Sequence, residues 1–306
     1  MSRVLVTGAA SGLGAALTRA FRERGDEVLA TDVTGRGGFE TGAGAPSSTT
    51  GGRAGAPSST TGGGAGVPSS TTGGGAGAPS STIGGAGDVM RLDITSDDDW
   101  AAAVGWVEDR WGGLDLLVNN AGVAGGGRID VAGLDEWQLI LDVNLLGMVR
   151  GCRAFTPMLK RQRSGAILNV ASLAGLVHPA GMASYNAVKA GVVALTETLG
   201  HELAAYGVTA HVVCPSYFRT HLLSSLRGAD EALRAVMTHL VESSPLTADQ
   251  IASAVLAGID AGDEVILPDP MARAAYGQKL RDRPAYDAQL RRQAARLHEL
   301  GGSPAE

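Results

Sequence analysis

Apolar and polar positions along the chain predict short buried strands that alternate with longer helices. Apolar runs typical of buried strands cover 3–7, 27–31, 88–93, 114–118, 166–170, 208–213 and 264–267. Apolar residues three or four positions apart predict helices over 15–25, 97–111, 134–158, 184–206 and 247–261. Strands that alternate with helices in this way predict an α/β fold, a doubly wound parallel sheet with helices on both faces.

Residues 41–87 interrupt this pattern between the second and third predicted strands. Pro46, Pro57, Pro68 and Pro79 recur with an 11-residue period in units rich in Gly, Ser and Thr. An 11-residue period can indicate a right-handed helical supercoil, but these units have no apolar stripe. They cannot bury enough apolar surface to offset their ordering entropy. We predict a flexible, disordered low-complexity insertion, with a glycosylated or partner-binding tether as the alternative.

The last segment, 270–306, is basic and amphipathic. The pattern predicts a helical tail that packs on the body of the protein or on a neighbouring subunit, with docking on a membrane surface as the alternative. We therefore expect one domain over 1–269, which carries the insertion, followed by this tail.

A glycine-rich turn, TGAASGLG at 7–14, joins the first predicted strand to the first predicted helix. Gly8, Gly12 and Gly14 permit a tight turn and close approach of a pyrophosphate to the backbone and the helix N-terminus. Asp32 ends the second predicted strand, 18 residues after Gly14. A carboxylate at this place binds a ribose 2′-hydroxyl and repels a 2′-phosphate, which favours NAD over NADP.

Tyr185 and Lys189 lie four residues apart in the predicted helix that starts near 184, so they share one face. A phenol has a pKa near ~10 in water and exchanges protons poorly at neutral pH. An ammonium one turn away favours the phenolate, so we expect Lys189 to lower the pKa of Tyr185. The pair is then suited to moving a proton on or off a hydroxyl or carbonyl group.

Polar residues follow other predicted strands. Asn119 to Gly122 end the fourth strand, and Ser172 follows the fifth. Asn144 stands among apolar neighbours of a predicted helix, where its amide must be hydrogen-bonded, either structurally or in a proton path. Small and amide residues at the carboxyl ends of strands suit a crevice that holds a ligand.

Composition narrows the class of protein. A net charge of -6 gives no general attraction to nucleic acid or an anionic membrane, and no apolar run reaches the ~18 residues of a membrane span. Cys152 and Cys214 lie in apolar surroundings and predict inert thiols in a reducing compartment. The Cys and His residues are scattered, so we expect no metal site. The chain starts directly on a strand without a leader pattern, and we expect a cytoplasmic protein.

With these motifs in this order, the chain resembles the classical short-chain dehydrogenase/reductase (SDR) family over most of its length except 41–87. The resemblance implies a Rossmann-like fold, hydride transfer with a nicotinamide cofactor, and assembly into a dimer or tetramer. The implied catalytic set is Asn144, Ser172, Tyr185 and Lys189. Tyr185 would be the general acid/base, Ser172 would hold the substrate oxygen, and Asn144 would anchor a water. The implied cofactor-binding set is Gly8, Ser11, Gly12, Leu13, Gly14, Asp32, Asp93, Ile94, Asn119, Ala121, Gly122, Tyr185, Lys189, Pro215 and Thr220.

The family usually has Pro-Gly after the sixth strand, whereas this chain has Pro215-Ser216. Serine lacks the freedom of glycine at positive φ, so the sequence does not predict the backbone conformation of this loop. The residues expected to form the substrate wall are Leu173, Leu176, Val177, His178, Met182, Tyr217, Phe218, Leu222 and Leu223.

These residues favour NAD-dependent oxidation of an apolar or alicyclic secondary alcohol, or reduction of the matching ketone. The alternatives are an NADP-dependent carbonyl reductase of a biosynthetic pathway, a nucleotide-sugar epimerase, and a non-catalytic dinucleotide-binding scaffold. Asp32 disfavours the first, the glycine spacing disfavours the second, and the complete Ser/Tyr/Lys set disfavours the third.

The predicted insertion can be tested by replacing 41–87 with about eight Gly/Ser residues. Because doubling a loop's length changes the closure free energy by only ~0.6 kcal/mol, the melting temperature and turnover are expected to stay near wild type. A tenfold or larger increase in the Kd for NAD would instead make the repeat part of the cofactor site.

Overall fold

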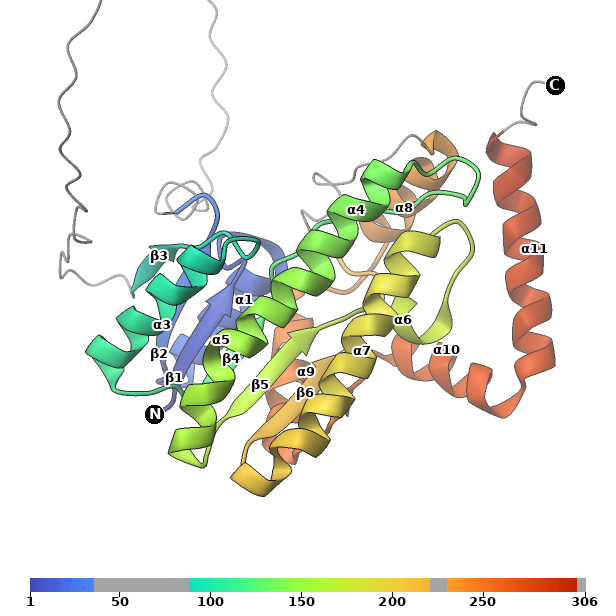
Figure 1. Ribbon diagram of the computed structural model, residues 1–306. Coiled ribbons are helices and arrows are strands. Elements are labelled where there is room, and N and C mark those ends of the chain that lie inside the picture. Colours follow the sequence, from blue (N-terminus) through green and yellow to red (C-terminus); the bar gives the residue numbers. More distant parts are fainter. Residues whose placement is uncertain (36–87, 221–229, 302–306) are drawn as a thin grey trace, which may run out of the picture. The chain divides into compact units, whose positions relative to one another are not determined.

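The computed structural model describes residues 1–35, 88–220 and 230–301. In these ranges the strands form one parallel sheet of seven strands, in the order β3-β2-β1-β4-β5-β6-β7 (Figure 1). The order reverses direction between β1 and β4, which is the switch point where ligands bind in doubly wound sheets. The predicted Rossmann-like α/β fold is therefore confirmed. The insertion predicted over 41–87 lies outside the described residues.

The elements follow the alternation expected from the sequence. The strands are β1 Arg3–Thr7, β2 Glu27–Asp32, β3 Val89–Arg91, β4 Leu116–Asn119, β5 Ala166–Val170, β6 Thr209–Val213 and β7 Val265–Ile266. The helices are α1 Gly12–Glu23, α3 Asp97–Trp111, α4 Leu134–Leu141, η1 Asp142–Leu146, α5 Gly147–Gln162, α6 Ala174–Val177, α7 Ala183–Leu203, η2 Ala204–Tyr206, α8 Glu231–Glu242, α9 Ala248–Ala261, α10 Pro270–Arg281 and α11 Arg283–Gly301.

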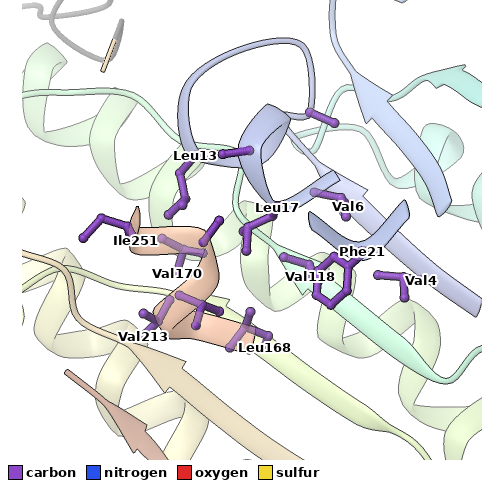
Figure 2. Close-up of a cluster of buried hydrophobic side chains, with 14 of the residues drawn as sticks. Val4, Val6, Leu13, Leu17, Phe21, Val118, Leu168, Val170, Val213 and Ile251 are labelled. Atoms are coloured by element: carbon purple, nitrogen blue, oxygen red, sulfur yellow. The ribbon is translucent and has the colours of Figure 1, made fainter. Parts of the chain in front are cut away.

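One face of the sheet is covered by α1 and α9. Val4 and Val6 of β1 face these helices, and Leu17 and Phe21 of α1 pack on them together with Ile251 of α9 (Figure 2). Phe21 is completely buried. This packing sets the position of α1, and hence of the glycine turn that precedes it.

The opposite face is covered by α3, α5 and α7. Leu5 of β1 points to this side, where Trp100 of α3 meets Phe155 of α5 edge to face, with ring centroids 6.3 Å apart. Because both faces are covered, successive residues of β1 such as Val4, Leu5 and Val6 are apolar, as in buried parallel sheets. The N-terminus of α3 is capped by Ser96, which accepts a hydrogen bond from the Asp99 amide.

The long helix predicted over 134–158 is interrupted. It consists of α4, the π-helical turn η1 and α5. Asn144 lies in η1 and is completely buried. A π-helical turn adds a residue without breaking the run of apolar positions, so the spacing alone could not predict it.

The C-terminal segment forms two helices where the sequence predicted one helical tail. Asp269 caps α10, and the chain turns at Asp282 into α11. Tyr286 of α11 is buried and donates a hydrogen bond to the Val177 carbonyl oxygen, 2.5 Å away. Leu297 is also buried, in a cluster with Met182, Tyr185 and residues of α8. Both helices are therefore packed on the body of the protein.

No helix in the described part of the chain is long and apolar enough to cross a bilayer.

Candidate active site

A cavity of about 1000 Å³ lies at the carboxyl ends of the strands, where β1 and β4 diverge. Its wall is formed by the glycine turn, the loops after β2, β4, β5 and β6, and faces of α7, α8 and α11. The cavity therefore occupies the position at which ligands bind in this class of sheet.

The glycine turn forms one end of the cavity. Gly8 and Gly12 have φ of 64° and 54°, in the left-handed region, and both line the cavity together with Ser11 and Leu13. A Cβ on Gly8 would lie 2.8 Å from the Ala121 Cα atom. The turn thus has the close backbone approach and the helix N-terminus that fit a pyrophosphate.

Gly14 does not line the cavity, although the sequence predicted that it would contact cofactor. A Cβ at this position would lie 2.1 Å from the Gly8 carbonyl oxygen. Gly14 therefore permits the first turn of α1 to pack against the glycine turn, and its contribution to the site is indirect.

Two carboxylates line the same end of the cavity. The Asp32 carboxylate accepts hydrogen bonds from the Ala10 amide (3.2 Å) and the Thr34 hydroxyl (2.8 Å), so it is fixed against the glycine turn. Asp93 accepts hydrogen bonds from the Thr95 hydroxyl and amide, which hold the pKa of this carboxyl below its usual value. Both groups are placed to accept hydrogen bonds from hydroxyl or amine groups of a nucleoside.

Asn119, which the family resemblance places among the cofactor-binding residues, does not line the cavity. Asn119 is buried on the α5 side of the sheet, where its amide donates to Asn169 Oδ1, 2.9 Å away. Its neighbour Asn120 lines the cavity and donates to the Thr7 carbonyl oxygen (2.8 Å). Residues of a strand alternate between its faces, so Asn119 shares the face of Leu117, a signal that the sequence contained.

Ala121 and Gly122 after β4, and Ile94 after β3, also lie on the cavity wall, as do Pro215 and Thr220 after β6.

Tyr185, Lys189 and Ser172 line the same cavity as the glycine turn. Tyr185 is in the first turn of α7, and the Lys189 Nζ atom lies 5.7 Å from the centroid of its ring. The Lys189 ammonium donates to the Val170 carbonyl oxygen, at the end of β5 (2.9 Å). Ser172 follows the same strand and is hydrogen-bonded to the Tyr185 hydroxyl. The three side chains predicted from the sequence as a catalytic set are thus brought together.

The expected lowering of the Tyr185 pKa is not found. Burial raises the pKa of Tyr185 to about 12, and the hydrogen bond with Ser172 opposes this only in part. Burial likewise lowers the pKa of Lys189 to about 8, because an ammonium with few polar neighbours is poorly solvated. Loss of solvation is therefore the largest influence on both pKa values, which the helical spacing alone could not reveal.

Asn144 supports the wall without lining the cavity. Its Oδ1 atom accepts from the Val123 amide (2.8 Å), and its Nδ2 atom donates to the Val123 carbonyl oxygen (2.9 Å). The sequence left two roles open for this amide, a structural hydrogen bond or a place in a proton path. The two hydrogen bonds to Val123 correspond to the structural role. They hold Val123, which does line the cavity.

Ser216 replaces the glycine that the family usually has after β6, and its φ is not positive. Its amide donates to Asp269 Oδ2 (2.9 Å), and its hydroxyl donates to Asp269 Oδ1 (2.7 Å). Asp269 is almost completely buried and also accepts from the Ala272 amide, which caps α10. Serine therefore does not strain the loop, and it connects the site to the C-terminal helices.

The expected substrate wall is largely present. Leu173, Val177, Met182, Tyr217 and Phe218 line the cavity. Leu176 packs away from it in the core, and the exposed His178 instead contacts the Lys279 ammonium at 3.2 Å. The remaining two expected residues, Leu222 and Leu223, lie outside the described ranges.

Sequence reasoning missed a second part of the wall, contributed by α8 and α11. These residues are Leu233, Val236, Met237, Leu240, Val241, Tyr286, Gln289, Leu290, Gln293, Arg296, Leu297 and Leu300. Their helical spacing was visible in the sequence, but the partner on which each face packs was not.

The shifted pKa of Lys189 predicts a pH-dependent stability. Its folded-state value of about 8 lies below the usual 10.5, so the unfolded chain binds more protons between these two pH values. The free energy of unfolding contributed by Lys189 therefore rises from about pH 8 to about pH 10.5. Thermal melts of the cofactor-free protein should show wild type gaining stability relative to Lys189→Met across this window. If the melting temperatures of the two proteins changed with pH in parallel, the lowered pKa of Lys189 would be contradicted.

The family model and similar known proteins point to the same family. A family model for short chain dehydrogenase matches residues 80–231. The chain is 30% identical to the 3-oxoacyl-[acyl-carrier-protein] reductase FabG of Vibrio cholerae, over 82% of this chain and 86% of that protein. It is also 30% identical to the 2-(R)-hydroxypropyl-CoM dehydrogenase of Xanthobacter autotrophicus, over 85% and 93%. A shorter match, 38% identical over 45% of this chain and 53% of the relative, is to the trans-4-hydroxycyclohexanecarboxylate dehydrogenase of Sinomonas cyclohexanicum.

Solved structures agree on the fold. An SDR of Burkholderia phymatum in complex with NAD has a TM-score of 0.71 at 23% identity, covering 100% of this chain and 98% of that one. A short chain dehydrogenase of Burkholderia cenocepacia in complex with NADP has a TM-score of 0.68 at 26% identity, covering 94% and 97%. The glycine turn, the Ser172–Tyr185–Lys189 arrangement and these relatives together show that the chain belongs to the short-chain dehydrogenase/reductase family.

Proposed function

We propose that this oxidoreductase transfers a hydride between NAD and a secondary alcohol or its ketone. The observation that carries the proposal is that Tyr185 and Ser172 lie on the same cavity wall as the glycine turn, with Lys189 between the tyrosine and the end of β5. A bound nicotinamide would accept or donate the hydride. The residues of this chain would bind the substrate oxygen and move its proton.

In this proposal, Tyr185 is the general acid/base and Ser172 holds the substrate oxygen beside it. Burial keeps the Tyr185 phenol neutral, which is the form that donates a proton to a ketone oxygen during reduction. Proton donation leaves Tyr185 as a phenolate, and in oxidation it is this phenolate that accepts the hydroxyl proton, because the acid of one direction is the conjugate of the base of the other. Lys189 would bind the nicotinamide ribose, and Asn144 would act through Val123 as a positioning residue.

The preference for NAD rests on Asp32. Its carboxylate is fixed on the cavity wall by the Ala10 amide and Thr34, where it would accept a hydrogen bond from a ribose hydroxyl and repel a 2′-phosphate. Within the described part of the wall, the cations are Lys189 and Arg296, and neither belongs to the loops that carry Asp32. NADP is the alternative cofactor, because the similar structure from Burkholderia cenocepacia was solved in complex with NADP.

The substrate is proposed to have an apolar or alicyclic body. Met182, Tyr217, Leu233 and Met237 supply an apolar wall near Tyr185. Two relatives are named for oxidation of a hydroxycyclohexanecarboxylate and of a hydroxypropyl thioether, both of which are secondary alcohols.

A cytoplasmic homodimer or homotetramer without nucleic-acid or membrane partners completes the proposal. Leu134, Leu139, Leu141 and Leu146 are exposed on α4 and η1, although leucine favours burial. This surface supports self-association.

Tyr185→Phe tests the proton-transfer role. The variant is expected to lower turnover by ~10²–10⁴, the usual contribution of a positioned acid/base, and to leave the Kd for NADH nearly unchanged. Turnover is followed at the reduced-nicotinamide absorbance, with NADH binding measured by its fluorescence. Retention of more than about a tenth of wild-type turnover, with chemistry rate-limiting, would reject this role.

Asp32→Ala tests the cofactor preference. Loss of a hydrogen bond to a charged group is expected to weaken NAD binding by roughly 1–3 kcal/mol and to relax discrimination against NADP. Asp32→Asn is the matched control, since it removes the charge and keeps hydrogen-bonding capacity, so it should admit NADP with a smaller loss for NAD. Dissociation constants for both cofactors decide the matter. A wild-type protein that already binds NADP more tightly contradicts the assignment.

A further inference from the structure

Helix α11 presents one face to the substrate end of the cavity. Tyr286, Gln293, Leu297 and Leu300 line the cavity from this face, at spacings of three to seven residues, and Arg296 lines it beside them. Leu297 anchors the face because its side chain is buried against Gly181, where a Cβ would lie 2.5 Å from Leu297 Cδ2. The position of α11 on the cavity is therefore fixed by packing.

Arg296 differs from the other charged groups on the cavity wall. Asp32 and Asp93 lie on the loops after β2 and β3, and the Lys189 ammonium is bonded to Val170. Within the described residues, Arg296 makes neither an ion pair nor a hydrogen bond. Even Glu299, three residues further along the helix, does not pair with it. Arg296 is an exposed residue on the cavity wall, and a guanidinium without a carboxylate partner there is available to an anionic ligand.

We propose that the substrate carries a carboxylate at the end remote from its reacting carbon, and that Arg296 binds this carboxylate. The guanidinium offers parallel N–H donors that match a carboxylate in a bidentate pair. Gln293 lies almost one turn earlier on the same wall and adds an amide donor. Leu233, Met237 and Leu297 line the cavity with apolar surface that suits a hydrocarbon body.

This inference rests on the proposed function, because it names the class of alcohol that the site takes. The competing explanation is an exposed arginine that only meets solvent, which is the ordinary state of arginine on a helix. Arg292 represents that ordinary state: it lies one turn earlier on α11 and is exposed, as Arg296 is, but unlike Arg296 it is not on the cavity wall. It therefore supplies a matched control for charge and helix position.

The experiment compares matched substrates that differ only in charge. One pair is trans-4-hydroxycyclohexanecarboxylate and its primary amide, and a second pair is a longer hydroxy fatty acid and its amide. The ratio of kcat/KM for the acid to that for the amide is measured with NAD for wild type, Arg296→Ala, Arg296→Lys and Arg292→Ala. We expect wild type to prefer at least one acid by about tenfold or more, as for hydrogen bonds to a charged group.

Arg296→Ala should bring this ratio near one by raising KM for the acid, with KM for the amide and kcat within about twofold of wild type. Arg296→Lys should retain part of the preference, and Arg292→Ala should retain all of it. Raising KCl from about 50 to about 500 mM should reduce the wild-type preference, since salt screens exposed charges. A wild-type ratio near one, or the same loss in Arg292→Ala as in Arg296→Ala, overturns the inference and leaves the proposed function intact.

Absence of turnover of every alcohol and ketone with either cofactor would instead reject the proposed function. The carboxylate inference is then decided by binding alone, in a calorimetric titration of 4-oxocyclohexanecarboxylate into the protein saturated with NADH. Tighter binding to wild type than to Arg296→Ala upholds the inference. Equal affinity for the two proteins, or no binding to wild type, overturns it.

Discussion

The site depends on one buried charge, the ammonium of Lys189. An uncompensated charge is expensive to bury, so it must be held by a fixed polar partner. The Val170 carbonyl oxygen provides that partner, and the hydrogen bond links α7 to the carboxyl end of β5. Gly175 lets α6 approach the Lys189 backbone, because a Cβ there would lie 2.6 Å from the Lys189 carbonyl oxygen. The position of Tyr185 one turn earlier follows from these contacts.

Much of the fold followed from the sequence because its signals are local. The strand at 166–170 and the helix at 97–111 were predicted with their observed bounds, since a buried strand has a short apolar run and a capped helix has a recognisable start. Ser172, Tyr185 and Lys189 were predicted to share a site, and the structure brings them to one wall. These predictions needed only the chain neighbours of each residue and a family resemblance.

The features that sequence reasoning missed depend on contacts between distant segments. The shifted pKa values of Tyr185 and Lys189 arise from burial by several elements at once, which no spacing reports. The π-helical turn at Asn144 keeps the apolar pattern intact, so the pattern continues through it. Each of these differences reflects tertiary packing that overrides a local signal.

The C-terminal helices give the cavity a wall that stands apart from the sheet. The proposed catalytic residues follow β5 or lie in α7, whereas α11 is held by Tyr286 and Leu297, and α10 by the Ser216–Asp269 contact. Cavity-facing side chains of α11 other than Tyr286 and Leu297 can therefore change while Ser172, Tyr185, Lys189 and the glycine turn remain in place. For enzyme engineering, this makes the last helix the segment in which to randomise residues when a new substrate is wanted. A fusion partner attached to the C-terminus would be joined to that same helix, so an affinity tag belongs at the other end of the chain.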